Sequence, residues 1–374
     1  MPSDDLRQRA ALRVSEIQQR IHHMPVLLGL DGFIDEIVRL VDKRFSTSEY
    51  ALIPTISALA ERISRAAGKS TNIELIVQKV KLGGNGPIMA NAMCAFGFEV
   101  TYIGNLGFPE IHPVFEDFAR KAKVYSIAEA GHTDALEFED GKIMLGKYES
   151  LRDVHYGNIL RHVGEERFRT LWDQARFYAL VNWTMIEGMT DFWQQLLAHH
   201  CRPDADKIIF FDLADPEKRT PEDIREALET ISRFADFYHV ILGCNEKESM
   251  ELSAILGIEV GGNDMDAIRK RAEAMRKAMN IQTVVIHPVK FAVAASLEDS
   301  AAVHGPYIEK PLISTGGGDH FNAGFCLGMI AGFDLETALL CGVGTSGYYV
   351  RHAEPPTLEQ LADFLRQWGT SAAG

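Results

Sequence analysis

Short apolar runs alternate with helical segments through the second half of the chain. From about residue 165, the runs FYALVNW, KIIFFDLAD, DFYHVILGCNE and TVVIHPV are separated by stretches with helical periodicity. Such alternation predicts a parallel sheet that is covered by helices on both faces. Ligands of these sheets bind beyond the carboxyl ends of the strands. Asp212, Asn245 and His287 each follow a predicted strand, so we expect them on one rim of the sheet.

The first half of the chain has a different pattern. Residues 4–23 place apolar positions loosely on one side and predict an amphipathic helix, within an N-terminal helical extension over residues 1–24. The segment 73–82 alternates like a half-exposed strand. The segment 135–146 predicts a β-hairpin, because an Asp-Gly pair separates two alternating runs. These two segments do not fit the strand–helix rhythm and are candidates for a small separate sheet.

Composition narrows the class of protein. The chain has 374 residues, of which 46% are hydrophobic, enough for one large core with a smaller appendage. Its net charge of −14 argues against nucleic acid or an anionic membrane as the main partner, although a local pocket can still bind a small anion. Five scattered cysteines and the lack of a long apolar run predict a cytoplasmic protein that spans no membrane.

The segment STGGGDHFNAGF, at residues 314–325, is the most distinctive. Each glycine would cost a helix interior roughly 1 kcal/mol, so three of them before an apolar run suggest a helix N-terminus. Unpaired N–H groups of Gly316, Gly317 and Gly318 would be open to an anion there. Asp319, in the first turn, is placed to accept a proton from a hydroxyl. Phosphoryl transfer needs this pairing, although a plain glycine turn with a capping aspartate also explains the pattern.

Three weaker motifs each allow a structural and a functional interpretation. GGNGPIMANA, from Gly83, is a turn into a helix or a ligand-binding loop. ILGCNEKES places Asn245 and Glu248 three residues apart, as a capping box or as support for hydrated Mg²⁺. GLDGFIDEI places Asp31 and Asp35 near a strand end, as acceptors for substrate hydroxyls or as a cap and a surface residue. Histidines do not show zinc-site spacing, so a catalytic zinc is not expected.

In this order, over roughly residues 26–352, the motifs resemble those of the PfkB carbohydrate kinase family, the ribokinase-like sugar kinases. TGGGDHFNAGF is similar to the family's Gly-Ala-Gly-Asp signature, and NEKE to its Asn-x-x-Glu. The resemblance implies a single ribokinase-like kinase domain over residues 1–374. This domain would be a three-layer α/β/α sandwich with a mostly parallel central sheet. A small β-sheet lid would come from the segments near 73–82 and 135–146.

The resemblance also implies an activity: transfer of the γ-phosphoryl group of ATP to a hydroxyl of a sugar or related small polyol, with Mg²⁺ as cofactor. By position, Asp319 would be the catalytic base. The anion hole and the contacts to the nucleotide phosphates would come from Gly316, Gly317, Gly318 and Asn245. Asn245 and Glu248 would support Mg²⁺ through water. Substrate hydroxyls would be held by Asp31, Asp35, Gly83, Gly84 and Asn85. Lid strands often pair in this family, which allows a homodimer through the lid.

The sequence departs from the family pattern at three places. Ile88 stands where the sugar-binding loop commonly carries an asparagine, and Asn85 can compensate. Ile313 stands where an aspartate often precedes the catalytic one by six residues, which weakens the case for a monovalent-cation site. HPVKFA replaces a glycine-containing nucleotide loop, where Lys290 either meets a phosphate or is only solvated.

Two further enzyme hypotheses stay within the same fold: ADP as the phosphate donor, or a nucleoside as the acceptor. A third hypothesis belongs to another class, a kinase-like protein that binds a ligand for regulation without turnover. The retained Asp319 argues against it, because a pure binder has no need of a base there. The sequence does not name the acceptor.

Overall fold

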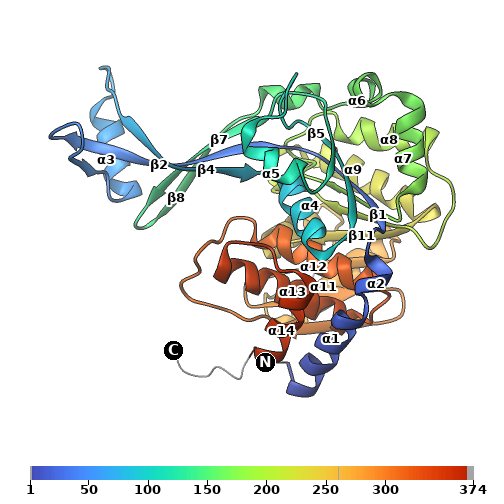
Figure 1. Cartoon of the computed structure of the whole chain (residues 1–374). Helices are drawn as coiled ribbons and strands as arrows, with labels where there is room; N and C mark the ends of the chain where they lie inside the picture. Colours follow the sequence, from blue (N-terminus) through green and yellow to red (C-terminus); the bar gives the residue numbers. More distant parts are fainter. Residues whose placement is uncertain (1, 260, 369–374) are drawn as a thin grey trace.

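The computed structural model describes residues 2–259 and 261–368, which form a large helix-covered sheet and a second sheet that projects from it (Figure 1). In the described part of the chain, the large sheet has nine strands in the order β14-β13-β12-β11-β10-β9-β1-β5-β6. The strands from β12 to β6 in this order are parallel, and β13 and β14 add an antiparallel hairpin. The bounds are β1 Pro25–Leu30, β5 Glu99–Gly104, β6 Lys123–Ser126, β9 Phe177–Val181, β10 Ile208–Asp212, β11 His239–Cys244, β12 Thr283–Ile286, β13 Phe291–Ala295 and β14 Ser300–His304.

Alternate side chains of the strands enter two separate cores. Val26 and Leu28 of β1 pack into one core and Leu27 into the other, as the two-residue period of a strand requires. The first core is covered by α1 Asp4–Glu16, α4 Asn85–Phe96, α12 Gly317–Ile330, α13 Leu335–His352 and α14 Leu358–Gln367. The second is covered by α6 Tyr156–Val163, α7 Glu165–Gln174, α8 Met189–His199, α9 Pro221–Arg233, α10 Glu246–Ile255 and α11 Met265–Met279. The predicted three-layer sandwich with a mostly parallel sheet is confirmed.

The N-terminal helix is shorter than the sequence pattern predicts. Instead of one helix over 4–23, α1 ends before Ile17 and a single turn, α2 Gln18–Ile21, follows. Ala11 and Val14 face the core, whereas Leu12 is 57% exposed. Leu12 lies on the solvent side because the buried stripe of α1 is formed by Arg7, Ala10, Ala11 and Val14. Residues 1 and 369–374 lie outside the described residues.

The second sheet contains the segments that broke the strand–helix rhythm. Its order is β3-β2-β7-β8, with β4 also paired to β2. The bounds are β2 Phe33–Arg44, β3 Tyr50–Leu52, β4 Glu74–Gly83, β7 Gly131–Phe138 and β8 Gly141–Lys147. The predicted strand at 73–82 is β4, and the predicted hairpin is β7–β8, where Phe138 faces Gly141. Helix α3 Ile56–Arg65 was not expected, and its Leu59 packs with Val38 and Leu136 in a small core on one face of this sheet.

Short elements complete the described structure. They are the helix α5 Glu116–Ala119 and the 3₁₀ turns Pro113–Phe115, Glu149–Asp153, Pro216–Lys218 and Phe234–Asp236. Within residues 2–259 and 261–368, every helix is too short or too polar to cross a membrane.

Candidate active site

Two cavities meet at the N-terminus of α12, beyond the carboxyl ends of the central strands. The apolar cavity, of about 390 Å³, is lined by residues that include Pro288, Val289, Phe291, Tyr307 and Val343. The lid cavity, of about 370 Å³, lies beneath the second sheet and is lined by residues that include Asp35, Asn85, Thr133, Asn182, Glu248 and Asp319. Asn245 borders both cavities. Asn245 and His287, which follow strands of the large sheet, therefore line cavities at the predicted rim. The two cavities lie side by side and share Asn245.

The three glycines of the 314–325 segment form the boundary between the cavities. Gly316 precedes α12 with a φ of 91°, a left-handed conformation that glycine adopts without strain. Gly316 lines the lid cavity, and Gly317 and Gly318 line the apolar cavity. The first N–H groups of α12 thus lie beside both compartments, and the helix dipole favours an anion there. The structure places the glycines at the predicted helix N-terminus.

Asp319 lies in the first turn of α12 and lines the lid cavity, with 9% of its surface exposed. Its Oδ1 accepts a hydrogen bond from the side-chain amide of Asn85 at 2.9 Å. Burial, and after it the charge of Asp212, raises the pKa of Asp319 well above its usual value, while the Asn85 hydrogen bond opposes the shift. A carboxylate with a raised pKa is a stronger proton acceptor than an ordinary aspartate once it is ionised.

Asp31 is buried beneath the start of α4 and does not line either cavity. Its two oxygens accept hydrogen bonds from the backbone N–H of Asn85 at 2.9 Å and of Gly86 at 2.8 Å. The Asn182 amide donates a third bond at 2.7 Å. Burial raises the pKa of Asp31 to about 6, and these three bonds oppose the rise. Asp31 therefore caps α4 from the turn between β1 and β2, and it holds Asn85 in place beside Asp319.

Asp35, the next aspartate along the strand, does line the lid cavity. Lys81 lies 3.6 Å from its carboxylate, and burial raises the pKa of Asp35 although the charge of Lys81 opposes the rise. Gly83 makes room for this carboxylate, because a Cβ at that position would come within 3 Å of it. A Cβ on Gly84, whose φ is 94°, would meet Asp31 in the same way. Gly83 thus leaves room for the carboxylate of Asp35, and Gly84 leaves room for that of Asp31.

Asn245 and Glu248 form the capping box at the start of α10. The Asn245 side chain accepts from the Glu248 N–H at 3.0 Å, and Glu248 accepts from the Asn245 N–H at 2.8 Å. The second oxygen of Glu248 accepts from the Asp215 N–H at 2.9 Å. Burial raises the pKa of Glu248, and burial together with the charge of Glu248 raises that of Asp212 to about 8. The capping-box interpretation is confirmed, and Glu248 also lines the lid cavity, so its support of Mg²⁺ stays a prediction.

Several cavity residues were missed by the sequence motifs. Asn182, after β9, turns its amide to Asp31, and its Oδ1 is buried without a hydrogen-bond partner among the described residues. Thr133 faces the lid cavity next to Asp35, its partner across β2 and β7. Lys142, on β8, donates a hydrogen bond to Thr315 at the glycine turn. Lys218 lines the cavity beside Asp215. Strand alternation could have indicated Thr133 and Lys142, which lie on strands of the second sheet. It could not have indicated Asn182 or Lys218, which lie outside that sheet.

The positions that depart from the family pattern have distinct surroundings. Ile88 is 8% exposed and lines the lid cavity, and Ile313 lines neither cavity. Lys290 is exposed, with its ammonium group 5.1 Å from the centre of the Tyr307 ring. His287 lines the apolar cavity next to Gly318, and burial lowers its pKa to about 4, so it is neutral at pH 7.

Solved structures with this fold belong to ribokinase-like kinases. Arabidopsis thaliana ribokinase, complexed with ribose and ATP, matches 92% of this chain and 99% of its own, with a TM-score of 0.63 at 14% identity. A nucleoside kinase of Methanocaldococcus jannaschii, an archaeal member of the ribokinase family, matches the same shares with a TM-score of 0.60 at 13% identity. At these identities the likeness establishes the fold alone, which is ribokinase-like.

The sequence itself identifies the family. The model of the prokaryotic ketohexokinase family matches residues 3–368. The ketohexokinase of Haloferax volcanii is 29% identical over 366 residues, which cover 96% of each chain. The chain belongs to the prokaryotic ketohexokinase family. It is a sugar kinase, a phosphotransferase with an alcohol group as acceptor, as the resemblance of its motifs predicted.

Proposed function

We propose that the acceptor is a ketohexose, bound in the lid cavity, and that Asp319 is the base of the reaction. One observation carries the proposal: the glycine turn and Asn245 separate an apolar cavity from a polar one, and Asp319 faces the polar one. The apolar cavity suits the base of ATP, and the turn lies where its terminal phosphate would end. The description of the matching family and the name of the Haloferax relative support a ketohexose over other acceptors.

Polar groups around the lid cavity suit a neutral polyol. The Asp35 carboxylate is an acceptor for sugar hydroxyls, and the unpaired Oδ1 of Asn182 is another. Asn85, which donates to Asp319, and Gly84 line the same cavity. Gly83 acts by leaving room for Asp35. Asp31 acts as a positioning residue, because its oxygens already hold Asn85, Gly86 and Asn182.

In the proposed reaction, the acceptor hydroxyl attacks the γ-phosphorus of ATP in line with the leaving oxygen of ADP. The new O–P bond forms as the bond to the β,γ-bridging oxygen breaks, and Asp319 takes the hydroxyl proton late. The N–H groups of Gly316, Gly317 and Gly318 donate to the phosphoryl oxygens, and Asn245 supports the phosphates. Positioning by the two cavities supplies much of the rate increase.

The residues near Asn245 fit a magnesium ion. Mg²⁺ prefers oxygen ligands, and burial together with the charge of Glu248 raises the pKa of Asp212 to about 8, so a cation would stabilise these carboxylates. Glu248 is held by two backbone N–H groups and still lines the lid cavity. Glu248 and Asn245 would hold the ion through water. When bound, Mg²⁺ would neutralise part of the charge on the ATP phosphates.

We also infer that the second sheet acts as a lid over the acceptor. Its strands supply Asp35, Thr133 and Met144 to the lid cavity, and Lys142 reaches Thr315 on the body. Exposed apolar side chains on β4 and β8, such as Val77 and Leu145, are consistent with a homodimer through the lid. The five free cysteines are consistent with a cytoplasmic location.

A donor and acceptor panel tests the proposal. Purified protein with Mg²⁺ and either ATP or ADP is incubated with ketohexoses, aldoses, pentoses and nucleosides, and sugar phosphate is measured by ³¹P NMR. We expect ATP with a ketohexose such as fructose to give the highest kcat/KM. A preference for nucleosides would overturn the acceptor, and a preference for ADP would overturn the donor. Ligand binding without phosphate transfer to any acceptor would favour the regulatory alternative.

A further inference from the structure

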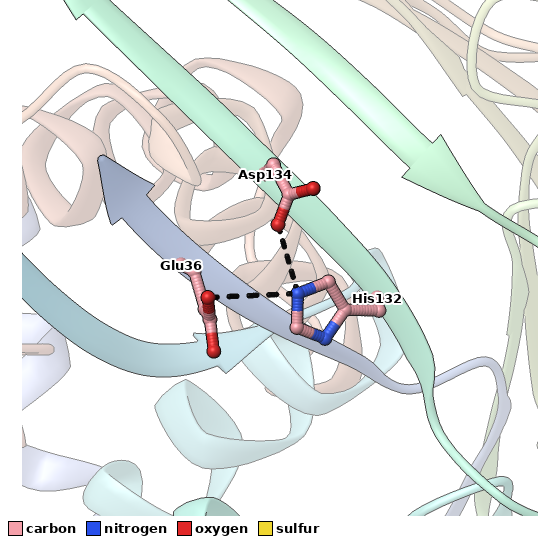
Figure 2. Close-up of side chains that lie close together, drawn as sticks. All are labelled: Glu36, His132 and Asp134. Atoms are coloured by element: carbon pink, nitrogen blue, oxygen red, sulfur yellow. Dashed lines mark hydrogen bonds and ion pairs between the residues drawn. The ribbon is translucent and has the colours of Figure 1, made fainter. Parts of the chain in front are cut away.

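A group of potential metal ligands lies on the lid sheet, outside both cavities. We propose that Glu36, His132 and Asp134 form a binding site for one divalent transition-metal cation of the Zn²⁺ type. One nitrogen and two carboxylate oxygens of these residues lie within 4.8 Å of one another. Figure 2 shows the three side chains turned toward a common point, Glu36 from β2 and the other two from β7. The proposal does not depend on the kinase reaction.

The register of the parallel strands brings the three residues together. Glu36 is the partner of Asp134, and Ile34 is the partner of His132. Residues two apart on a strand share a face, so all three side chains project from the same face of the sheet. Asp35 and Thr133 project from the opposite face, where they line the lid cavity. The cluster is thus built on paired backbone, which positions ligands more accurately than a loop does.

The distances are close to those of a coordinated ion. His132 Nε2 lies 2.9 Å from Asp134 Oδ1 and 3.8 Å from Glu36 Oε2. Zinc bonds of about 2.0–2.2 Å in tetrahedral geometry would separate neighbouring ligand atoms by roughly 3.3–3.5 Å. The two observed distances lie on either side of this value. Small rotations of the side chains would therefore bring the three atoms around one ion without any change in the strands.

The surroundings hold the side chains while leaving access for water. The side chains of Glu36, His132 and Asp134 are 29%, 26% and 16% exposed. The next residues on the same face, Val38 and Leu136, are 0% and 5% exposed in the small core under α3. The carboxylates thus stand at the edge of a packed region that limits their movement. Water can complete the coordination on the open side, as it does in three-ligand sites.

The ligand set favours a transition metal over Mg²⁺ or Ca²⁺. An imidazole nitrogen suits Zn²⁺ and its neighbours in the first row, whereas Mg²⁺ and Ca²⁺ prefer sites made of oxygen alone. The five cysteines do not compete, because burial raises the pKa of every one of them and keeps the thiols neutral. The ion held by Glu248 in the lid cavity would be a separate one.

Lys147 limits the affinity of the site. Its ammonium group lies 3.0 Å from Asp134 Oδ2, the oxygen that faces away from His132, and its side chain is 64% exposed. A bound dication would repel this ammonium group, and the exposed lysine can move into solvent. Without metal, Asp134 contacts both His132 and Lys147. Lys147 therefore opposes metal binding and leaves it weaker than in a cluster without the lysine.

Cobalt binding to the full chain tests the proposal, with excess Mg²⁺ present to saturate other sites. Co²⁺ is titrated while visible absorption and bound metal after dialysis are measured, and Zn²⁺ is then added as competitor. We expect one Co²⁺ per chain, without a thiolate charge-transfer band, displaced by Zn²⁺. His132→Gln and Glu36→Gln should each weaken binding at least about tenfold, since even outer partners of metal ligands contribute that much. Lys147→Gln should tighten it.

His304→Gln, an exposed histidine on β14, is the matched control and should leave cobalt binding unchanged. Circular dichroism and thermal unfolding without metal check that every variant is folded. In addition, Zn²⁺ should raise the melting temperature of the wild type more than that of His132→Gln. Failure of the wild type to bind Co²⁺, or equal binding by folded His132→Gln and wild type, would overturn the site. Tighter binding by Lys147→Gln would support it, and weaker binding would count against it.

Discussion

The side chain of Asn85 donates a hydrogen bond to Asp319 over 2.9 Å and joins two motifs that lie 234 positions apart. The backbone N–H of the same residue donates to Asp31. Asn85 therefore connects the carboxylate proposed as the base with the buried carboxylate that caps α4. Through this bond, Asn85 links the first turns of α4 and α12.

Replacing Asn85 with alanine should change the pH dependence of the reaction. Burial holds the pKa of Asp319 well above its usual value, and the Asn85 amide opposes this shift by stabilising the ionised form. Without the amide the pKa rises further, and only ionised Asp319 can accept a proton. The acid limb of the kcat/KM profile should move to higher pH, by about one unit for a charged hydrogen bond of about 1.5 kcal/mol.

Asn91→Ala is the control for this shift. Asn91 lies on the same helix and accepts a hydrogen bond from Lys121, away from the cavities. The acid limb of the kcat/KM profile of Asn91→Ala should coincide with that of the wild type. An Asn85→Ala profile whose limb stays in place, or moves to lower pH, would contradict the assigned coupling.

Gly83→Ala should weaken binding of the acceptor. The added methyl group would come within 3 Å of the Asp35 carboxylate and displace it or the backbone. Overpacking of this kind costs about 1–3 kcal/mol, so KM for the sugar should rise roughly tenfold or more. KM for ATP should change much less. Gly157→Ala, where a methyl group would have only ordinary contacts at 3.5 Å, is the control. Equal sugar KM values for the two variants would argue against a role of Asp35 in acceptor binding.

Lys142→Ala should lower kcat by about tenfold. The lysine reaches from the lid to Thr315, and its positive charge lies next to the turn that would hold the phosphoryl group. Because Lys142 lies on the lid, its charge would come close to the glycine turn when the lid covers the acceptor. Lys79→Ala removes an exposed lysine from another lid strand, β4, and should have no such effect. Unchanged turnover in Lys142→Ala would show that the contact serves the lid alone.

Glu248→Gln should raise the concentration of Mg²⁺ needed for half-maximal activity several-fold. The substitution keeps one oxygen for the cap but removes the negative charge that faces the lid cavity. Glu246→Gln removes a charge from the same helical turn without touching either cavity and serves as control. Superimposable Mg²⁺ titrations of wild type and Glu248→Gln would remove Glu248 from the metal site.

Local sequence was sufficient for the parts of the site that are local in the structure. Gly316 to Asp319 form one helix start, so spacing alone predicted their arrangement, and the same holds for Asn245 and Glu248. The parallel strands were also predictable, because each is a short apolar run. The central layers of the fold could therefore be inferred from pattern before any contact was known.

The parts that depend on distant contacts could not be inferred. Asp31 was expected to hold substrate hydroxyls, and only the packing of α4 against β1 shows that its oxygens bind backbone 54 and 55 positions away. Glu36 and His132 likewise share a face only through the register of β2 and β7. Helix α3, by contrast, could have been predicted, because Ile56, Leu59 and Ile63 recur at helical spacing.

The central claim is that Asp319 removes the proton of the acceptor hydroxyl at the meeting point of the two cavities. Asp319→Asn keeps the shape and the hydrogen-bond acceptor for Asn85 but cannot take up the proton. General-base contributions are typically about 100- to 10,000-fold. Asp334→Asn, on an exposed helix cap that asparagine also suits, is the control.

The most direct test is the rate of phosphoryl transfer to the sugar by Asp319→Asn in a single turnover, with ATP affinity measured on the same sample. We expect the rate to fall at least about 100-fold while the dissociation constant for ATP stays within a few-fold of the wild type. An Asp319→Asn protein that transfers phosphate at the wild-type rate would contradict the account.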